Sequence, residues 1–220
     1  ISADHGENLG EFNIYGDHQT ADTITSRVPL IIRPPQSVKC QRGRVDDSLI
    51  YQGDMAATML ELAGGEVPAG WDNKSFAPQF KADQPADHRT ELVLSQMAWS
   101  CQRSIRWGDW LCIRSYHDGY HGFPPVMLFN VVDDPHLQTD LAPTHVDVSN
   151  HGIALLDKWM GEMLNTATHP DDPMRTVMLE GGPLHTRGVL PEYLKRLRAT
   201  GRADGADALT KAHPIAAAGK

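Results

Sequence analysis

The sequence predicts an α/β protein that carries a small four-stranded antiparallel α+β subdomain in its second half. Three observations support this fold class. A short apolar run at residues 27–34 is typical of a buried strand and ends at two prolines. A helical pattern follows at 48–64. From residue 91 the apolar residues take the period of short strands, followed by one further helix.

The predicted helix at 48–64 has its apolar residues near helical spacing. Ser48 suits the N-cap of this helix, and Gly64 suits its C-terminal end. Residues 65–90 are rich in Gly, Pro, Asp and Lys and show no clear period. We therefore expect a surface excursion between two subdomains there.

Four short segments predict the strands of the second half: ELVLSQM, QRSIRWG, DWLCIRSYH and VMLFNVV. Gly108 and Asp109 lie between the second and third segments and indicate a hairpin. A helix is predicted at about 150–165, where apolar residues line one face. Pro191 suits the start of a last helix and Gly201 its end. The segment beyond Gly201 is small and polar, and we expect its end to be frayed.

The composition excludes several classes of protein. The 220 residues hold 20 Lys and Arg against 28 Asp and Glu, a net charge of −8, so nothing favours nucleic acid or an anionic membrane surface. No apolar run approaches the ~18–20 residues that span a bilayer. Cys40, Cys101 and Cys112 show no CxxC spacing, so we expect three buried free thiols.

The chemistry-bearing residues begin almost at the first residue, so we expect the chain to start inside a longer protein. Asp4 and His5 follow apolar and small residues, at the predicted end of a strand. A hard oxygen donor beside an imidazole suits a divalent cation, and Gly6 permits a tight turn after the pair. For an isolated Asp-His pair the simpler interpretation is favoured, in which Asp4 caps a helix and His5 lies on the surface.

The surrounding sequence favours the metal-binding interpretation of Asp4 and His5 over the helix cap and surface histidine. The string SADHGENLGEFNIYGDH is followed by SRVPLIIRPP, then by YQGDMAATMLELAG and MLFNVVDDPHLQTDLA. In this order, over about residues 1–165, the strings resemble the C-terminal portion of the sulfatase family, in its formylglycine-dependent type, within the alkaline-phosphatase-like superfamily. EGGPLHTRGVLPEYLKRLRATGR resembles a C-terminal extension of a subset of bacterial sulfatases.

The resemblance implies a fold and a division of the chain. Residues 1–88 would form the closing part of a large mixed sheet that carries helices on both faces. Residues 89–168 would form the antiparallel sheet with its helix, and residues 169–220 a helical extension.

The resemblance also implies roles for residues. Asp4 and His5 match paired metal ligands; the metal in such sulfatases is usually calcium, with manganese or zinc in relatives. Many sulfatases carry a sulfate-binding Lys thirteen residues after the metal-binding Asp, but Asp17 stands there in this sequence. We assign that role to His18, whose imidazolium could donate to a sulfate oxygen or protonate the leaving alkoxide. The alternative is that His18 packs beside Tyr15.

The sequence leaves more than one role open for each of three neighbouring carboxylates. Asp17 could orient the imidazole of His18. Glu7 and Glu11 either support the metal ligands or are simply exposed to solvent.

The nucleophile that the resemblance implies is absent from this sequence. The family uses a formylglycine made from Cys or Ser in C/S-x-P/A-x-R, and none of the three cysteines lies in that motif. The family's early metal carboxylates are also missing. We expect the intact protein to hydrolyse sulfate esters of small molecules or carbohydrates, and this chain to be inactive without the N-terminal half. The alternatives are a phosphonate or phosphodiester hydrolase of the same superfamily and a non-catalytic binding module.

Two further histidines, His117 and His121, lie in the segment SYHDGYHGFPP after a predicted strand. An aromatic, polar, Gly-containing loop suits contact with a sugar or aryl sulfate. A plain surface loop is the favoured interpretation of the segment, with substrate binding as the alternative. A zinc site is disfavoured, because His-x-x-x-His needs a helix that Gly and Tyr oppose.

Overall fold

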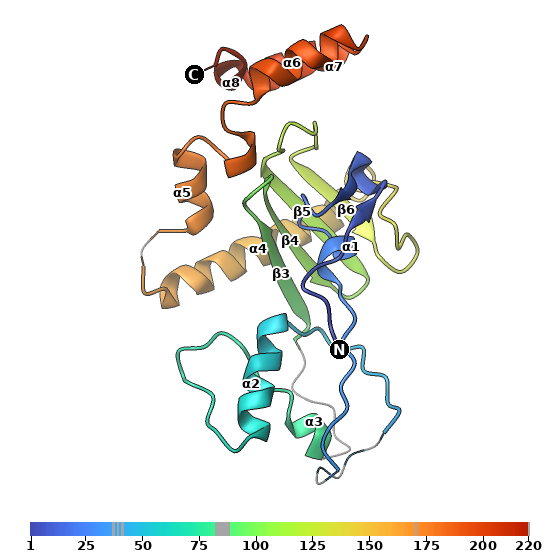
Figure 1. Cartoon of the computed structure of the whole chain (residues 1–220), viewed down its shortest axis with the longest axis vertical. Coiled ribbons are helices and arrows are strands. Elements are labelled where there is room, and N and C mark those ends of the chain that lie inside the picture. The colour runs from blue at the N-terminus through green and yellow to red at the C-terminus, as the bar shows by residue number, and fades with distance from the viewer. Residues whose placement is uncertain (37, 39, 41, 82–88, 170, 220) are drawn as a thin grey trace. The chain divides into compact units, whose positions relative to one another are not determined.

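A four-stranded antiparallel sheet lies at the centre of the second half of the chain (Figure 1). The computed structural model describes residues 1–36, 38, 40, 42–81, 89–169 and 171–219. The strands β3 (Glu91–Gln96), β4 (Cys101–Trp107), β5 (Trp110–His117) and β6 (Val126–Asn130) are neighbours in that order. The four predicted strands are thereby confirmed.

The turn between β4 and β5 forms where the sequence predicts it. Trp107 pairs with Trp110 across Gly108 and Asp109. Gly108 has a φ of +46°, in the left-handed region that a residue without Cβ adopts at little cost. The hairpin prediction is therefore confirmed.

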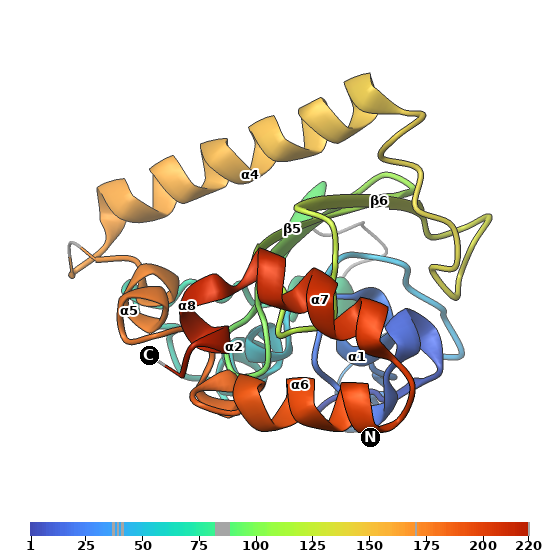
Figure 2. The same cartoon turned by 90° about the horizontal axis from the view of Figure 1, so that it is seen from above.

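One face of the sheet is covered by helix α4 (Val146–Thr166), which lies across the strands in Figure 2. Cys112 on β5 points to this face and packs in a cluster with Ile105, Leu128 and Leu156. A Cβ on Gly152 would lie only 2.7 Å from the Cβ of Cys112, so a glycine is needed where the helix comes closest to the sheet. The helix predicted at 150–165 is confirmed and starts one turn earlier.

The opposite face of the sheet is covered by the N-terminal segment of residues 4–28. That segment contains β1 (Asn8–Leu9), the 3-10 helix η1 (Glu11–Asn13), β2 (Tyr15–Asp17) and the short helix α1 (Thr23–Ser26). Leu111 and Ile113 of β5 point to this face because side chains alternate along a strand. They cluster with Phe129, and Phe12 and Ile24 of the segment pack against them. The sheet is therefore the platform on which this segment rests.

The chain ends in short helices: α5 (Pro173–Leu179), η2 (Leu184–Thr186), α6 (Leu190–Ala199), α7 (Ala203–Ala212) and α8 (Pro214–Ala217). The last predicted helix is confirmed as α6, and Gly201 follows it with a φ of +77°. Fraying was expected only at the end of the segment after Gly201, and α8 is helical there as far as Ala217. Ala206 and Leu209 of α7 are buried in one cluster with Leu194 and Tyr120.

Residues 4–28 and 93–220 form one compact unit, and residues 1–3 and 29–92 form another. The second of these contains α2 (Gln52–Leu62) and α3 (Pro78–Lys81). The helix predicted at 48–64 is confirmed, but it begins at Gln52 with Tyr51 as N-cap. Ser48 does not cap it, because its hydroxyl and backbone N–H both bind Asp46. The predicted division of the chain at residues 88 and 168 stays a prediction.

The apolar run at 27–34 was predicted to be a buried strand, and its described structure differs. Leu30 forms only an isolated bridge with Ser2, and the Ile31 side chain is 60% exposed. The run pairs only with the first residues of the chain, which are themselves exposed, so no layer of described structure covers it. The prediction of burial is wrong there.

Cys101 and Cys112 are buried free thiols, as predicted, and Cys40 is half-buried. Burial raises the pKa of Cys101 to about 11 and that of Cys112 to about 12, so neither thiol is a ready nucleophile. In the described part of the chain, no helix is long and apolar enough to cross a membrane.

Candidate functional site

The predicted site residues come together through a two-stranded hairpin. Strands β1 and β2 are antiparallel, and Asn8 pairs with Asp17. Glu7 precedes Asn8 and His18 follows Asp17, so this register brings Glu7 and His18 opposite each other. The tight reversal between the strands uses a φ of +138° at Gly10.

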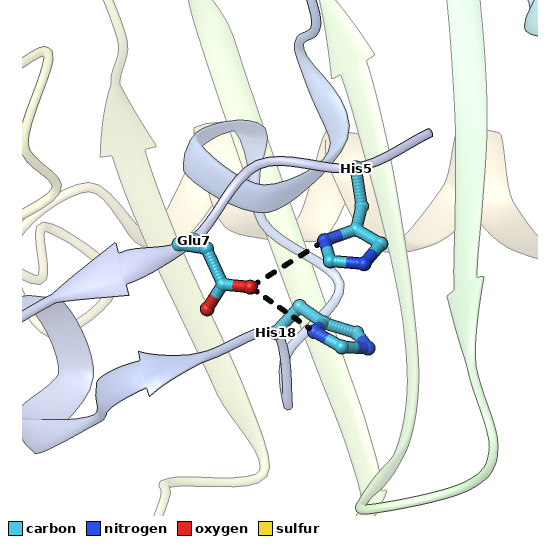
Figure 3. A group of neighbouring side chains, drawn as sticks. All are labelled: His5, Glu7 and His18. Carbon is cyan, nitrogen blue, oxygen red and sulfur yellow. Dashed lines mark ion pairs between the residues drawn. The ribbon is translucent and has the colours of Figure 1, made fainter. Parts of the chain in front are cut away.

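His5, Glu7 and His18 form a cluster, drawn in Figure 3. The rings of His5 and His18 are stacked, with centroids 3.9 Å apart and planes 27° from parallel. Oε1 of Glu7 lies 3.7 Å from Nδ1 of His5 and 3.9 Å from Nδ1 of His18. One ligand atom from each side chain lies within 4.8 Å of the others, so the three could hold a metal ion. His18 thus packs on His5, whereas Tyr15 is 74% exposed.

Asp4 lies at the edge of this cluster. Its Oδ2 is 3.8 Å from Nε2 of His5, and its Oδ1 accepts a hydrogen bond of 3.0 Å from the backbone N–H of His5. No described helix begins at Asp4, so the helix-cap alternative does not apply. Two ligand atoms of one divalent ion typically lie about 3–4 Å apart, so Asp4 and His5 fit a shared ion.

The tautomer of His5 follows from its contacts. Nδ1 of His5 is 2.9 Å from the carbonyl oxygen of Gly6, which can only accept, so Nδ1 carries a proton. In neutral His5 the lone pair is then on Nε2, the atom that faces Asp4. A metal-binding histidine commonly gives its other N–H to a carbonyl in this way.

The charges of the site shift its titrations. Hydrogen bonding to the backbone N–H of His5 holds the pKa of Asp4 below its usual value. The hydrogen bond to Gly6 raises the pKa of His5, and Asp4 and Glu7 add to this. Burial acts to raise the pKa of Asp17, but hydrogen bonds from Gln19 and from the His18 backbone outweigh it and the pKa falls. Asp17 is thus ionised near neutral pH.

The loop that carries His18 is fastened to the sheet by side chains of β3, β4 and the turn between them. Gln96 donates a 2.8 Å hydrogen bond to the carbonyl of His18, and Ser100 donates one of 2.8 Å to the carbonyl of Gln19. The buried Gln102 accepts a 3.1 Å hydrogen bond from the backbone N–H of Ala21. The antiparallel sheet therefore fixes the backbone on which His18 stands.

These fastening residues were missed by sequence reasoning, as was Asp22. Asp22 is fully buried and caps α1 by accepting hydrogen bonds from the backbone of Ile24 and Thr25. Burial raises its pKa. An Asp directly before TITS is an N-cap signal that could have found it. Gln96 and Gln102 carry no comparable signal, because their partners are about 80 residues away in sequence.

Glu11 does not join the cluster. Its carboxylate accepts a 2.8 Å hydrogen bond from the backbone N–H of Leu9, and its Oε1 lies 3.1 Å from Nδ1 of His136. Hydrogen bonds from its own backbone N–H and from that of Leu9, together with the contact to His136, lower the pKa of Glu11. Glu11 therefore stabilises the hairpin turn.

His117 and His121 lie in different surroundings. Nδ1 of His117 accepts a hydrogen bond from the backbone of Gly119, and its ring lies against that of His213 at the end of α7. Burial lowers the pKa of His117. His121 reaches the site loop instead, since its Nε2 is 2.7 Å from Oε1 of Gln19. The structure brings His121, but not His117, into contact with the residue next to His18.

Comparisons with known proteins agree with this architecture. Residues 10–115 match the model of the family described as N-sulphoglucosamine sulphohydrolase, C-terminal, a range that includes His18. The chain is 33% identical over 93 residues to the multifunctional alkaline phosphatase superfamily protein PehA of Trinickia caryophylli, covering 42% of this chain and 18% of that protein. It is 27% identical over 135 residues to an N-acetylglucosamine-6-O-sulfatase of Bacteroides thetaiotaomicron, covering 60% and 22%. The chain thus spans about a fifth of these relatives.

Solved structures share the fold at low sequence identity. One, a protein in complex with its substrate D-glucosamine-2-N,6-O-disulfate, has a TM-score of 0.61 at 22% identity, over 75% of this chain and 33% of that one. The phosphonate monoester hydrolase SpPMH of Silicibacter pomeroyi has a TM-score of 0.61 at 21% identity, over 77% and 35%. Taken together, the family model, the relatives and the shared fold support the assignment of this chain to the C-terminal portion of a sulfatase of the alkaline-phosphatase-like superfamily.

Proposed function

We propose that the intact protein is a sulfuric ester hydrolase, in which this chain supplies two metal ligands and one catalytic histidine. The observation that carries the proposal is the convergence of Asp4, His5 and His18 at one hairpin, with His18 stacked on His5 at 3.9 Å. A metal-binding pair beside an imidazole suits an ester whose anionic group binds the metal and whose leaving oxygen needs a proton.

Asp4 and His5 are the proposed ligands, through Oδ2 and Nε2. Nδ1 of His5 donates to the carbonyl of Gly6 and is therefore not free to bind an ion beside Glu7. Nε2 keeps a lone pair and faces Asp4, so we place the ion between Nε2 and Oδ2 of Asp4. A bound divalent ion would supply positive charge to an oxygen of the ester. Calcium remains the first expectation, and the imidazole ligand makes manganese or zinc the alternatives.

His18 is the proposed proton donor. Its Nδ1 is buried, has no hydrogen-bond partner in the described part of the chain, and faces two carboxylates: Asp17 at 3.5 Å and Glu7 at 3.9 Å. The two carboxylates can accept a hydrogen bond from Nδ1. The other ring nitrogen points away from Glu7 in Figure 3, and in the imidazolium form, which has a proton on both nitrogens, it could donate to the leaving oxygen.

The substrate class we propose is a sulfated carbohydrate. One relative is named an N-acetylglucosamine-6-O-sulfatase, and another, 36% identical over 77 residues, is an ulvan-active sulfatase of Formosa agariphila. The nucleophile would be a formylglycine supplied by the N-terminal half of the enzyme, together with the remaining metal ligands.

A second candidate is a phosphonate or phosphodiester hydrolase, because one of the solved structures that share the fold is a phosphonate monoester hydrolase. Turnover of 4-nitrophenyl sulfate and of bis(4-nitrophenyl) phosphate by the full-length enzyme separates the two, because the leaving group is the same. A higher kcat/KM for the sulfate supports the first candidate, and a higher value for the phosphodiester supports the second. If the full-length enzyme lacks the C/S-x-P/A-x-R motif and hydrolyses neither ester, the chain belongs to a non-catalytic module.

A further inference from the structure

The side-chain amide of Gln19 has a fixed orientation. One end of the amide lies 2.8 Å from Oδ2 of Asp17 and donates to it. Asp17 is an ionised carboxylate with a lowered pKa, so it can only accept. The NH₂ group of Gln19 must therefore face Asp17, and its carbonyl oxygen must face the other way.

The group on that other side is His121. Oε1 of Gln19 is 2.7 Å from Nε2 of His121, and a carbonyl oxygen can only accept. The proton of neutral His121 is consequently on Nε2. Asp17 thus determines, through Gln19, the tautomer of a histidine about 100 residues away in sequence.

The opposite edge of the His121 ring is available to a ligand. A Cβ on Gly119 would lie 3.2 Å from Cδ2, so the Nε2 and Cδ2 edge faces the protein. The ring is stacked on Phe123, with centroids 5.0 Å apart and an interplanar angle of 18°. In the described part of the chain, Nδ1 of His121 has no hydrogen-bond partner. Removal from water lowers the pKa of His121, so the ring is neutral near pH 7 and Nδ1 keeps its lone pair.

We propose that Nδ1 of His121 is a substrate-binding acceptor, which receives a hydrogen bond from a hydroxyl or N–H group that neighbours the scissile ester. This inference rests on the proposed function. A neutral acceptor does not attract the anionic sulfate, so His121 recognises the group beside the ester. Its ring contacts the side chain of Gln19, the residue that follows the proposed proton donor His18. The gain for a substrate that carries such a donor is about two- to tenfold, the range of one net hydrogen bond.

The first test measures the tautomer in the 220-residue chain. With ¹⁵N-histidine labelling, long-range ¹H–¹⁵N spectra at pH 7.5 should show His121 as a single neutral form with the proton on Nε2. Gln19→Leu should convert it to a mixture of tautomers. The matched control is Gln138→Leu: the amide of Gln138 donates to the backbone carbonyl of His136, so its loss should leave His121 unchanged. A proton on Nδ1, or a cationic ring, in the unmodified chain overturns the inference.

The second test measures specificity in the full-length enzyme. 4-Nitrocatechol sulfate carries a hydroxyl beside the ester, and 4-nitrophenyl sulfate lacks it. His121→Phe should lower kcat/KM about two- to tenfold for the first substrate and leave the second unchanged. An equal loss on both substrates overturns the inference and indicates a structural role. If the wild-type enzyme hydrolyses neither ester, the proposed function is refuted. The His121 tautomer, measured separately in the 220-residue chain, then shows whether the structural part of this inference still holds.

Discussion

Replacing Gly6 by alanine should displace the site without touching any proposed catalytic group. Gly6 donates a 2.7 Å hydrogen bond from its N–H to the carbonyl of Thr25, which brings residues 4–7 close to helix α1. A Cβ on Gly6 would lie 2.2 Å from the carbonyl oxygen of Ile24, where ordinary contacts need more than 3.0 Å. Because that oxygen belongs to the backbone, the segment must move by about 1 Å to relieve the clash.

Overpacking of this kind costs about 1–3 kcal/mol. For a chain of this size, 2 kcal/mol lowers the Tm by about 4–8 °C. Displacement of a catalytic group by 1 Å can also cost about a hundredfold in rate. Scanning calorimetry of the chain and kcat/KM of the full-length enzyme measure the two effects.

Gly161→Ala is the matched control. Gly161 lies in the middle of α4 with nothing within 4 Å of its added Cβ. Alanine there should stabilise the helix by up to about 1 kcal/mol. If Gly6→Ala melted at the same temperature as Gly161→Ala and kept full activity, the close approach at Gly6 would not determine the geometry of the site.

Three further predictions follow from the structure. Asp172→Asn should destabilise the chain by about 3 kcal/mol in urea unfolding, because Asp172 forms a bidentate, largely buried ion pair with Arg103 at 2.6 Å. The control Asp171→Asn breaks an exposed ion pair with Arg175 and should cost under about 0.5 kcal/mol. Arg103 lowers the pKa of Asp172, so the stabilisation by this ion pair is present above the ordinary pKa of an aspartate and is lost as the pH falls through the lowered pKa of Asp172. If Asp172→Asn unfolded in acid like the wild type, the ion pair would not be the source of that stability. The purified 220-residue chain should hydrolyse no 4-nitrophenyl sulfate, and measurable turnover would contradict the need for a nucleophile from outside it. Asp4→Asn in the full-length enzyme should lower bound metal, measured by mass spectrometry, together with activity on every ester, and unchanged metal content would place the ion elsewhere.

The sequence pattern was enough to predict those strands and helices whose own apolar residues repeat with a clear period. The strands β3 to β6 and helix α4 each repeat apolar residues with one period, and tertiary packing agrees with that period. The start of α2 was missed because its N-cap is Tyr51, an uncommon capping residue, with Asp54 completing the box. Helix α7 was missed because its sequence is small and polar, and only Ala206 and Leu209 are buried.

For the site, the sequence predicted the residue types but not their arrangement. Asp4, His5 and His18 were found because they lie in one continuous motif. That Glu7 meets His18 depends on the register of β1 and β2, which a bulge between Asn8 and Leu9 shifts. The support from Gln96 spans 78 residues and could not be predicted from a local pattern.

The central claim is that His18 protonates the leaving oxygen while other residues hold the metal, and one measurement tests it directly. In the full-length enzyme, kcat/KM of His18→Ala and wild type is compared on sulfate esters of rising leaving-group pKa, from 4-nitrophenol to a sugar alcohol, with metal content measured in parallel. The account predicts unchanged metal content and a loss that grows toward about 10²–10⁴-fold for the sugar alcohol and is small for 4-nitrophenol. An equal loss on every ester, accompanied by loss of the metal, would contradict it and make His18 a metal ligand.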